Sequence, residues 1–176
     1  MNLGATSPTG YGDYFAWGEI VPKDNYSWAT YEFNGSSFFL TKYNNSSSYG
    51  TVDNKTFKDY DYEDDAARQA LGGSWRMPTN AEWAELRNTS NCTWTWTTQN
   101  GINGRLVTSK KNGASIFLPA AGYSNLYNVG SYGYYWSSSL STVYPIDAYL
   151  VYFDSLNVSR YDNGRCFGFS VRPVSE

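Results

Sequence analysis

The most informative segment of this chain is Gly72-Gly73-Ser74-Trp75-Arg76-Met77-Pro78-Thr79-Asn80-Ala81-Glu82-Trp83. Its paired glycines predict a turn, and Pro78 lies where a proline often precedes a helix. The spacing from Thr79 to Glu82 is that of a capping box, in which each side chain accepts a hydrogen bond from the other residue's backbone. The segment therefore predicts a turn followed by a helix, with Trp83 and Leu86 on its core-facing side.

A second helix is predicted over residues 63–71. The acidic run 59–65 precedes the Ala-rich residues 66–71, and carboxylates at a helix N-terminus accept hydrogen bonds from its free N–H groups. A calcium site is the alternative for this run, because hard cations take several oxygen ligands from a short span. The run lacks the glycine and the spacing of an EF-hand loop, so capping is the preferred interpretation.

Outside these helices the pattern is one of strands and loops. Residues 34–56 are rich in Asn, Ser, Gly and Tyr, which predicts a long surface excursion. An Asn112-Gly113 turn joins two of the expected strands. Strands are predicted around residues 14–17, 93–97, 106–108, 115–118, 149–153 and 167–171. The order of these elements indicates an α+β domain with the helices first and a meandering sheet after them.

Length and composition predict one domain over residues 1–176 with an aromatic core, because 19% of the residues are Phe, Trp or Tyr. The net charge of -3 provides no basic surface for phosphates, so nucleic acid is not an expected partner. No window approaches the roughly 18 apolar residues of a membrane span, so membrane insertion is not expected either. The first residues lack the pattern of a signal peptide.

The chain has no histidine, which excludes Ser-His-Asp and Cys-His catalytic systems and His-ligated zinc. A carboxylate pair such as Asp13 with Glu19 remains an enzymatic alternative, and nothing in the sequence places these two beside a pocket. Cys92 and Cys166 either form a disulfide or stay as unpaired thiols, and the second alternative is preferred without a secretion signal. We expect no enzyme activity, no cofactor and no metal.

Three segments together resemble a known protein family. They are Tyr11-Gly12-Asp13-Tyr14-Phe15-Ala16-Trp17-Gly18-Glu19, residues 72–83 as quoted above, and Gly168-Phe169-Ser170-Val171-Arg172-Pro173-Val174. The chain resembles the Fibrobacter/Bacteroides major paralogous domain, which is similar in turn to the formylglycine-generating-enzyme branch of the C-type lectin fold. The resemblance implies a C-type-lectin-like fold with two helices, a small twisted antiparallel sheet and long loops. It does not imply the enzyme's activity, because Cys166 has no second cysteine near it in sequence.

The C-terminal part of the chain has an unusual composition. Nine of the 17 tyrosines lie in residues 123–169, mixed with Ser, Asn, Asp and Gly, as in antibody loops. Residues 137–175 contain no Lys, Glu, Gln, Met or Trp, although these types supply 23 of the 176 residues. They are the types that an AAC or AAT codon cannot reach through changes of its adenines.

This pattern resembles the target protein of a diversity-generating retroelement, in which adenine-directed mutagenesis rewrites a C-terminal binding surface. A Tyr- and Ser-rich structural or adhesin module without diversification is the alternative, and the lack of histidine, which such codons can reach, favours that alternative. The resemblance implies a receptor on a phage virion or bacterial cell surface of a gut-type community. Its partner would be a protein or glycan ligand on a cell or virion surface.

The candidate contact residues belong to the variable segment, about 123–169, and all but Ile146 are polar or aromatic. Trp136 and Phe153 are assigned to the core, whereas Arg160, Tyr161 and Arg165 are expected as energetic anchors. Replacement of Tyr161 and Arg165 together by Ala is expected to abolish binding without a change in melting temperature. The full predicted set is Tyr144, Ile146, Asp147, Tyr149, Tyr152, Asp154, Asn157, Arg160, Tyr161, Asp162, Asn163, Arg165 and Phe167.

Overall fold

The structure is a computed structural model that describes residues 1–35, 39–124 and 126–175. Two α-helices, α1 (Ala66–Leu71) and α2 (Asn80–Arg87), lie among three short 3-10 helices at Trp28–Thr30, Ser47–Tyr49 and Phe57–Tyr60. The strands are β1 (Tyr14–Phe15), β2 (Trp75–Arg76), β3 (Cys92–Gln99), β4 (Ile102–Ser109), β5 (Ser115–Pro119), β6 (Gly133–Leu140), β7 (Asp147–Phe153), β8 (Val158–Gly164), β9 (Phe169–Ser170) and β10 (Val174–Ser175).

The predicted α+β, C-type-lectin-like fold with two helices and a small sheet is wrong. Across the described residues the fold is mostly strand, at 33%, with ten strands in three sheets, and only 14% helix. The sequence prediction missed β6 and β8, the two long strands beside β7 in the largest sheet, because their Tyr-, Ser- and Asn-rich residues show no alternating apolar pattern. Tyrosine has a high strand propensity, and the polar residues between tyrosines occupy the solvated positions of a strand.

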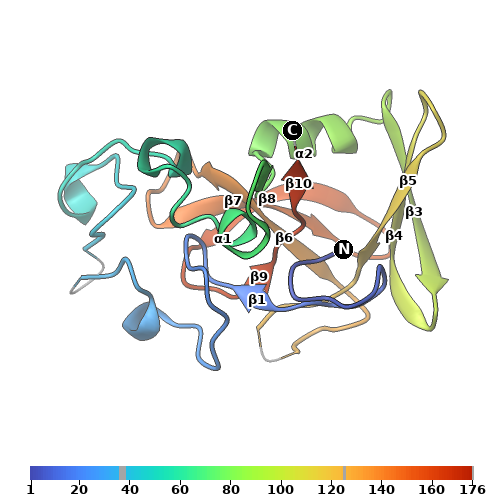
Figure 1. The fold of residues 1–176 in the computed structure, drawn as a ribbon, viewed down its shortest axis with the longest axis horizontal. Coiled ribbons are helices and arrows are strands. Elements are labelled where there is room, and N and C mark those ends of the chain that lie inside the picture. The colour runs from blue at the N-terminus through green and yellow to red at the C-terminus, as the bar shows by residue number, and fades with distance from the viewer. Residues whose placement is uncertain (36–38, 125, 176) are drawn as a thin grey trace.

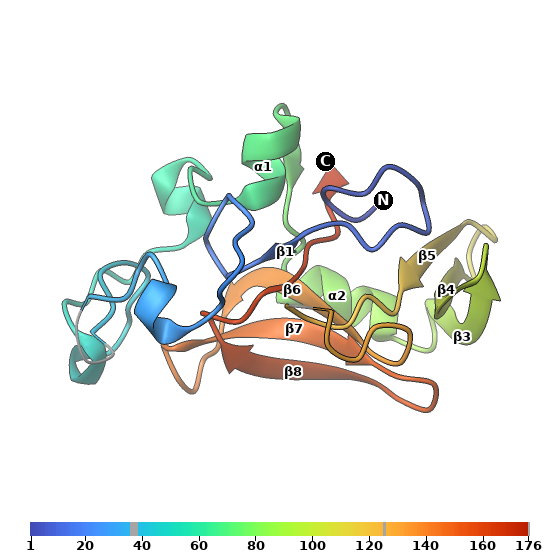
Figure 2. The ribbon, with the colours of Figure 1, turned by 90° about the horizontal axis from the view of Figure 1, so that it is seen from below.

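The largest sheet has the strand order β1-β9-β6-β7-β8, and its long strands are antiparallel neighbours. A second sheet, β3-β4-β5, projects at the opposite end from the loops of residues 26–35 and 39–60, and β10 pairs with β2 (Figure 1). Seen from below, β7 and β8 lie at the outer side of the molecule, with α2 behind them (Figure 2). Among the described residues no helix has the length and apolarity to cross a membrane.

Both predicted helices are present and capped at their N-termini, but α1 begins at Ala66 and not at residue 63, because Asp65 is its N-cap. Thr79 and Glu82 form the capping box of α2. The carboxylate of Asp65 is buried and accepts hydrogen bonds from the backbone N–H groups of Ala67, Arg68 and Met77. Since these contacts occupy the Asp65 oxygens, the structure supports capping rather than calcium ligation at this carboxylate.

Two clusters of buried residues hold the elements together. Trp17, Trp136 and Phe169 belong to the larger cluster, whereas Trp83 and Phe153 belong to the cluster between α2 and the large sheet. All three of these tryptophan indoles donate to backbone carbonyls: Trp17 to Ser137, Trp136 to Phe15 and Trp83 to Trp136. Each buried indole therefore adds a specific link between distant segments to its apolar contact area.

The segment predicted as a surface excursion, residues 34–56, is partly buried instead; its residues 36–38 lie outside the described part. Leu40, Tyr43 and Asn44 are 2% exposed or less. The carboxylate of Asp53 accepts from the backbone N–H groups of Tyr43 and Asn44 at 2.7 and 2.8 Å. The Tyr43 ring contacts Trp17 edge-on at 5.3 Å between centroids. Carboxylate-to-backbone bonds and one aromatic anchor thus fold a polar segment onto the core, which hydropathy patterns do not detect.

Candidate binding surface

The register of the large sheet decides which C-terminal side chains lie together. Residues opposite one another in antiparallel strands point to the same face, and successive residues point to opposite faces. One cross-strand row consists of Tyr134, Tyr152 and Ser159. This row lies on the face of the sheet that carries a cluster of aromatic side chains. On the other face, Tyr135 and Phe153 pack toward α2 and Trp83.

A continuous chain of ring contacts crosses the open face. The ring centroids are 5.5 Å apart for Tyr127 and Tyr123, 5.5 Å for Tyr123 and Tyr134, 5.3 Å for Tyr134 and Tyr152, and 6.3 Å for Tyr152 and Tyr161. All lie within the range of favourable aromatic pairs. We call this surface the aromatic face, and its members are Tyr123, Tyr127, Tyr132, Tyr134, Tyr152, Tyr161, Phe167 and Phe169.

The aromatic face combines rigid support with solvent access. Phe169 is buried and stacks on Tyr134 at 5.1 Å, so the centre of the face rests on the core. At its ends the side chains are open, because Tyr127 is 59% exposed and Tyr161 is 60% exposed. Exposed rings fixed by their neighbours lose little conformational entropy when a ligand covers them.

One carboxylate lies at the margin of the aromatic face. The Tyr152 hydroxyl donates to Asp154 Oδ2 at 2.8 Å, and the backbone N–H groups of Leu156 and Asn157 donate to Asp154 Oδ1 at 2.7 Å. Burial opposes ionisation of Asp154, but these hydrogen bonds outweigh it and its pKa is lowered. Burial and the same carboxylate raise the pKa of Tyr152. The Tyr152 phenol is therefore neutral beside a negatively charged Asp154 at neutral pH.

The structure brings only part of the predicted contact set to this surface. Tyr152, Tyr161 and Phe167 belong to the aromatic face, and Asp154 lies at its margin. Asn157 lies in the β7–β8 turn. Asn163 lies on the same face of β8 as Tyr161, but its side-chain oxygen accepts a hydrogen bond from the backbone N–H of Gly164. The others lie on the opposite face or in the β6–β7 connection, and they are Tyr144, Ile146, Asp147, Tyr149, Arg160 and Asp162.

The opposite face has its own contacts. The Arg160 guanidinium lies 4.7 Å from the centre of the Tyr149 ring, and Ser141 donates to Asp162 at 2.7 Å. Burial and, to a smaller extent, the charge of Asp162 raise the pKa of Asp147. A strand presents alternate residues to opposite sides, so the consecutive residues 160–163 cannot form one contact surface.

Arg165 is a clear correction, since it was predicted as a contact anchor and is fully buried. Its Nε donates to the Tyr31 hydroxyl at 2.9 Å, and its Nη1 donates to the carbonyls of Tyr43 and Pro145 at 3.2 Å each. The fourth acceptor is the Lys42 carbonyl, at 3.1 Å from Nη2. Arg165 is therefore a structural residue, and the predicted double Ala replacement with Tyr161 would destabilise the fold.

Five members of the aromatic face were not predicted as contact residues, namely Tyr123, Tyr127, Tyr132, Tyr134 and Phe169. They fall inside the segment 123–169 but outside the predicted contact set. Tyr132 and Tyr134 are two residues apart, which is the spacing of one strand face, and this signal could have identified them. Tyr123 and Tyr127 lie in a loop, where only the folded chain brings them to β6.

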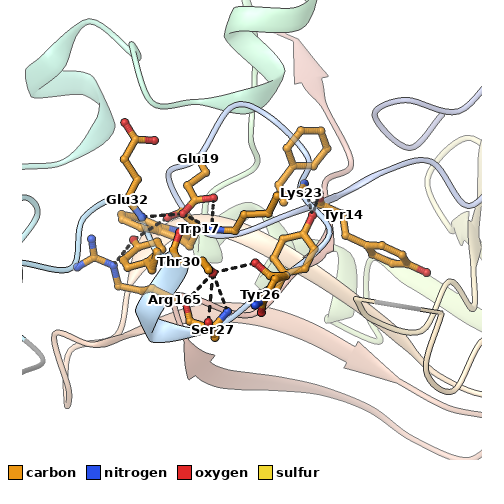
Figure 3. Close-up of polar contacts among 12 residues, drawn as sticks. Tyr14, Trp17, Glu19, Lys23, Tyr26, Ser27, Thr30, Glu32 and Arg165 are labelled. Carbon is orange, nitrogen blue, oxygen red and sulfur yellow. Dashed lines mark hydrogen bonds and ion pairs between the residues drawn. The ribbon is translucent and has the colours of Figure 1, made fainter.

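Of the groups considered for catalysis, Glu19 is occupied by structural contacts. Glu19 is 6% exposed and accepts from Lys23 Nζ and from the backbone N–H of Glu32 (Figure 3). Asp13, its proposed partner, is exposed. Both cysteines are free and buried, and burial raises the pKa of Cys166 to about 11. A thiol with this pKa is protonated near neutral pH and is a poor nucleophile.

A cavity of about 680 Å³ lies apart from the aromatic face, between residues 44–62 and the end of β6. Its walls include Asn44, Phe57, Ser139 and Thr142. Within the described residues, no three Cys, Asp or Glu side chains come together as a group that could hold a metal ion. Comparisons of the chain with protein-family models, with curated proteins and with solved structures find no match.

Proposed function

We propose that this chain binds a protein or glycan ligand through the aromatic face, as a receptor on a phage virion or bacterial surface. We also propose that positions on this face are diversified in sequence by adenine-directed mutagenesis of a retroelement. The observation that carries the proposal is the unbroken series of ring contacts from Tyr127 to Tyr161, with both ends exposed.

Physical chemistry supports a binding role for such a surface. Tyrosines give large contact areas and hydroxyl groups at low entropic cost, and they are enriched among residues that dominate binding energies. Three phenol rings, those of Tyr132, Tyr134 and Tyr152, contact one another, and each residue is partly exposed. Ring faces suit the C–H surfaces of sugars and the apolar side chains of proteins.

The experiment compares the ligand affinity of Ala variants at similarly exposed tyrosines, two on the aromatic face and one outside it. A glycan array and a displayed peptide library are screened first, and the strongest binder is titrated against the variants. Tyr127→Ala and Tyr161→Ala are each expected to weaken binding about tenfold or more, because each removes an exposed anchor of the aromatic face. Tyr144→Ala is the matched control, since Tyr144 is 53% exposed and lies in the β6–β7 connection.

The melting temperatures of all three variants should agree within about 2 °C, because exposed side chains contribute little to stability. Equal loss of affinity in the control and in the two test variants would contradict a site on the aromatic face. A binder that ignores Tyr127→Ala and Tyr161→Ala would contradict it as well.

A further inference from the structure

The outer edge of the large sheet is open at β8. β8 is the last strand in the sheet order and pairs with β7 on its inner side only (Figure 2). Asp154 donates its N–H to the Asn157 carbonyl, and Arg165 donates its N–H to the Ile146 carbonyl. Both bonds continue the register of β7 and β8, and in an antiparallel pair only every second pair of opposite residues is joined by backbone hydrogen bonds. Counted from these two bonds, the β8 residues that bond to β7 are those at positions 159, 161 and 163.

The backbone groups of Val158, Arg160 and Asp162 therefore point away from the sheet. No described residue supplies a hydrogen bond to these outward groups. Gly164, the next outward residue, is already satisfied, because its N–H donates to Asn163 Oδ1 and its carbonyl accepts from Phe167 N–H. Unpaired strand edges of this kind are templates for another strand.

We propose that the occupant of this edge is the β8 strand of a second copy of the chain, paired antiparallel about a two-fold axis at Tyr161. In this register Arg160 of each copy lies directly opposite Asp162 of the other, and each such pair exchanges two backbone hydrogen bonds. The proposal concerns self-association and does not depend on the identity of the ligand, although Tyr161 belongs both to the aromatic face and to the proposed interface.

Charge complementarity selects this register. The side chains of Arg160 and Asp162 lie on the same face of β8, two residues apart, with opposite charges. If one copy slides by two residues along the other, like charges meet. A slide in one direction places Arg160 opposite Arg160 of the second copy, and a slide in the other direction places Asp162 opposite Asp162. Like charges directly opposite one another destabilise a strand pair, whereas opposite charges stabilise it.

The two-fold axis also accounts for an exposed ring. Tyr161 is 60% exposed at the margin of the aromatic face. In the proposed pair it lies opposite Tyr161 of the second copy in a non-hydrogen-bonded position, where side chains approach most closely. The two aromatic faces then form one surface, and a closed isologous dimer leaves no free β8 edge.

The test uses charge reversal in the full chain. The molar mass is measured by light scattering at concentrations on the order of 100 µM, because an interface built on one strand edge is small. The unmodified chain is expected to rise from its 19.8 kDa toward twice that mass with concentration. Arg160→Asp alone and Asp162→Arg alone are each expected to remain monomeric, since each places like charges opposite one another.

An equimolar mixture of the two single variants is expected to dimerise, because each charge then meets its opposite. The double variant, with both Arg160→Asp and Asp162→Arg, should dimerise like the unmodified chain. Circular dichroism confirms that each variant is folded. A monomeric unmodified chain throughout the concentration range would overturn the proposal. So would single variants that dimerise as well as the unmodified chain, since the association would then use another surface.

Discussion

Arg165 holds three segments of the chain together through one guanidinium group. It lies between β8 and β9 and donates to the Tyr31 hydroxyl and to the carbonyls of Lys42, Tyr43 and Pro145. The planar group also lies 4.9 Å from the centre of the Trp17 ring. A buried arginine that bonds to several carbonyls organises a loop-rich region that has few strands of its own.

We predict that Arg165→Ala lowers the free energy of unfolding by about 3 kcal/mol, because it leaves a cavity and several buried acceptors without donors. Urea denaturation followed by fluorescence measures this change. Arg165→Lys is the control, since it retains the charge but not the planar arrangement of donors, and it should recover only part of the loss. A stable Arg165→Ala variant with weakened ligand binding would restore Arg165 as a contact residue.

At the scale of elements, the sequence predicted correctly those elements that are determined by contacts between neighbouring residues in the chain. The capping box at Thr79 and Glu82 and the turn at Asn112 and Gly113 depend on neighbours in the chain, and both were predicted from the residues alone. The strand β8 depends on β7 across the sheet, and no local pattern distinguishes its Tyr, Asp and Asn residues from a loop.

The β2–α2 junction carries the strongest perturbation of a surface carboxylate. Arg76 forms two hydrogen bonds of 2.8 Å with Glu82, which is also part of the capping box. The hydrogen bonds from Arg76, the largest cause, and those from Thr79 lower the pKa of Glu82 to about 2. Since the folded pKa lies below the unfolded value, ionised Glu82 stabilises the fold at neutral pH.

This stabilisation is fully present above the unfolded pKa of about 4.3 and is lost as the pH falls toward about 2. The side chain is 37% exposed, so solvent screening reduces the effect to about 1 kcal/mol. We predict that Glu82→Gln is less stable than the unmodified chain by this amount at pH 6, and that the difference disappears near pH 2. Urea titrations at both pH values measure it, and a difference independent of pH would assign it to packing.

At the scale of the whole molecule, the large sheet separates two kinds of position within one segment of sequence. Leu150 and Arg165 are buried, whereas Tyr152, Ser159 and Tyr161 reach the surface on the side of the aromatic face. Composition could identify the segment 123–169 as rich in potential contact residues. Residue type also assigned Trp136 and Phe153 correctly to the core, but it could not identify Arg165 as buried. The separation of buried from exposed positions follows from strand pairing between residues distant in sequence.

The same separation predicts where diversification can act. In sequences of this gene from a natural population, together with the DNA downstream, codons 152, 159 and 161 should vary and codons 150 and 165 should stay fixed. Buried positions cannot accept most substitutions without a loss of several kcal/mol, whereas exposed positions can. Substitutions confined to adenines of a nearby template copy would support a retroelement. Uniform variation without a template would leave a fixed binding module, and frequent variation at codon 165 would contradict the assignment of Arg165 to the core.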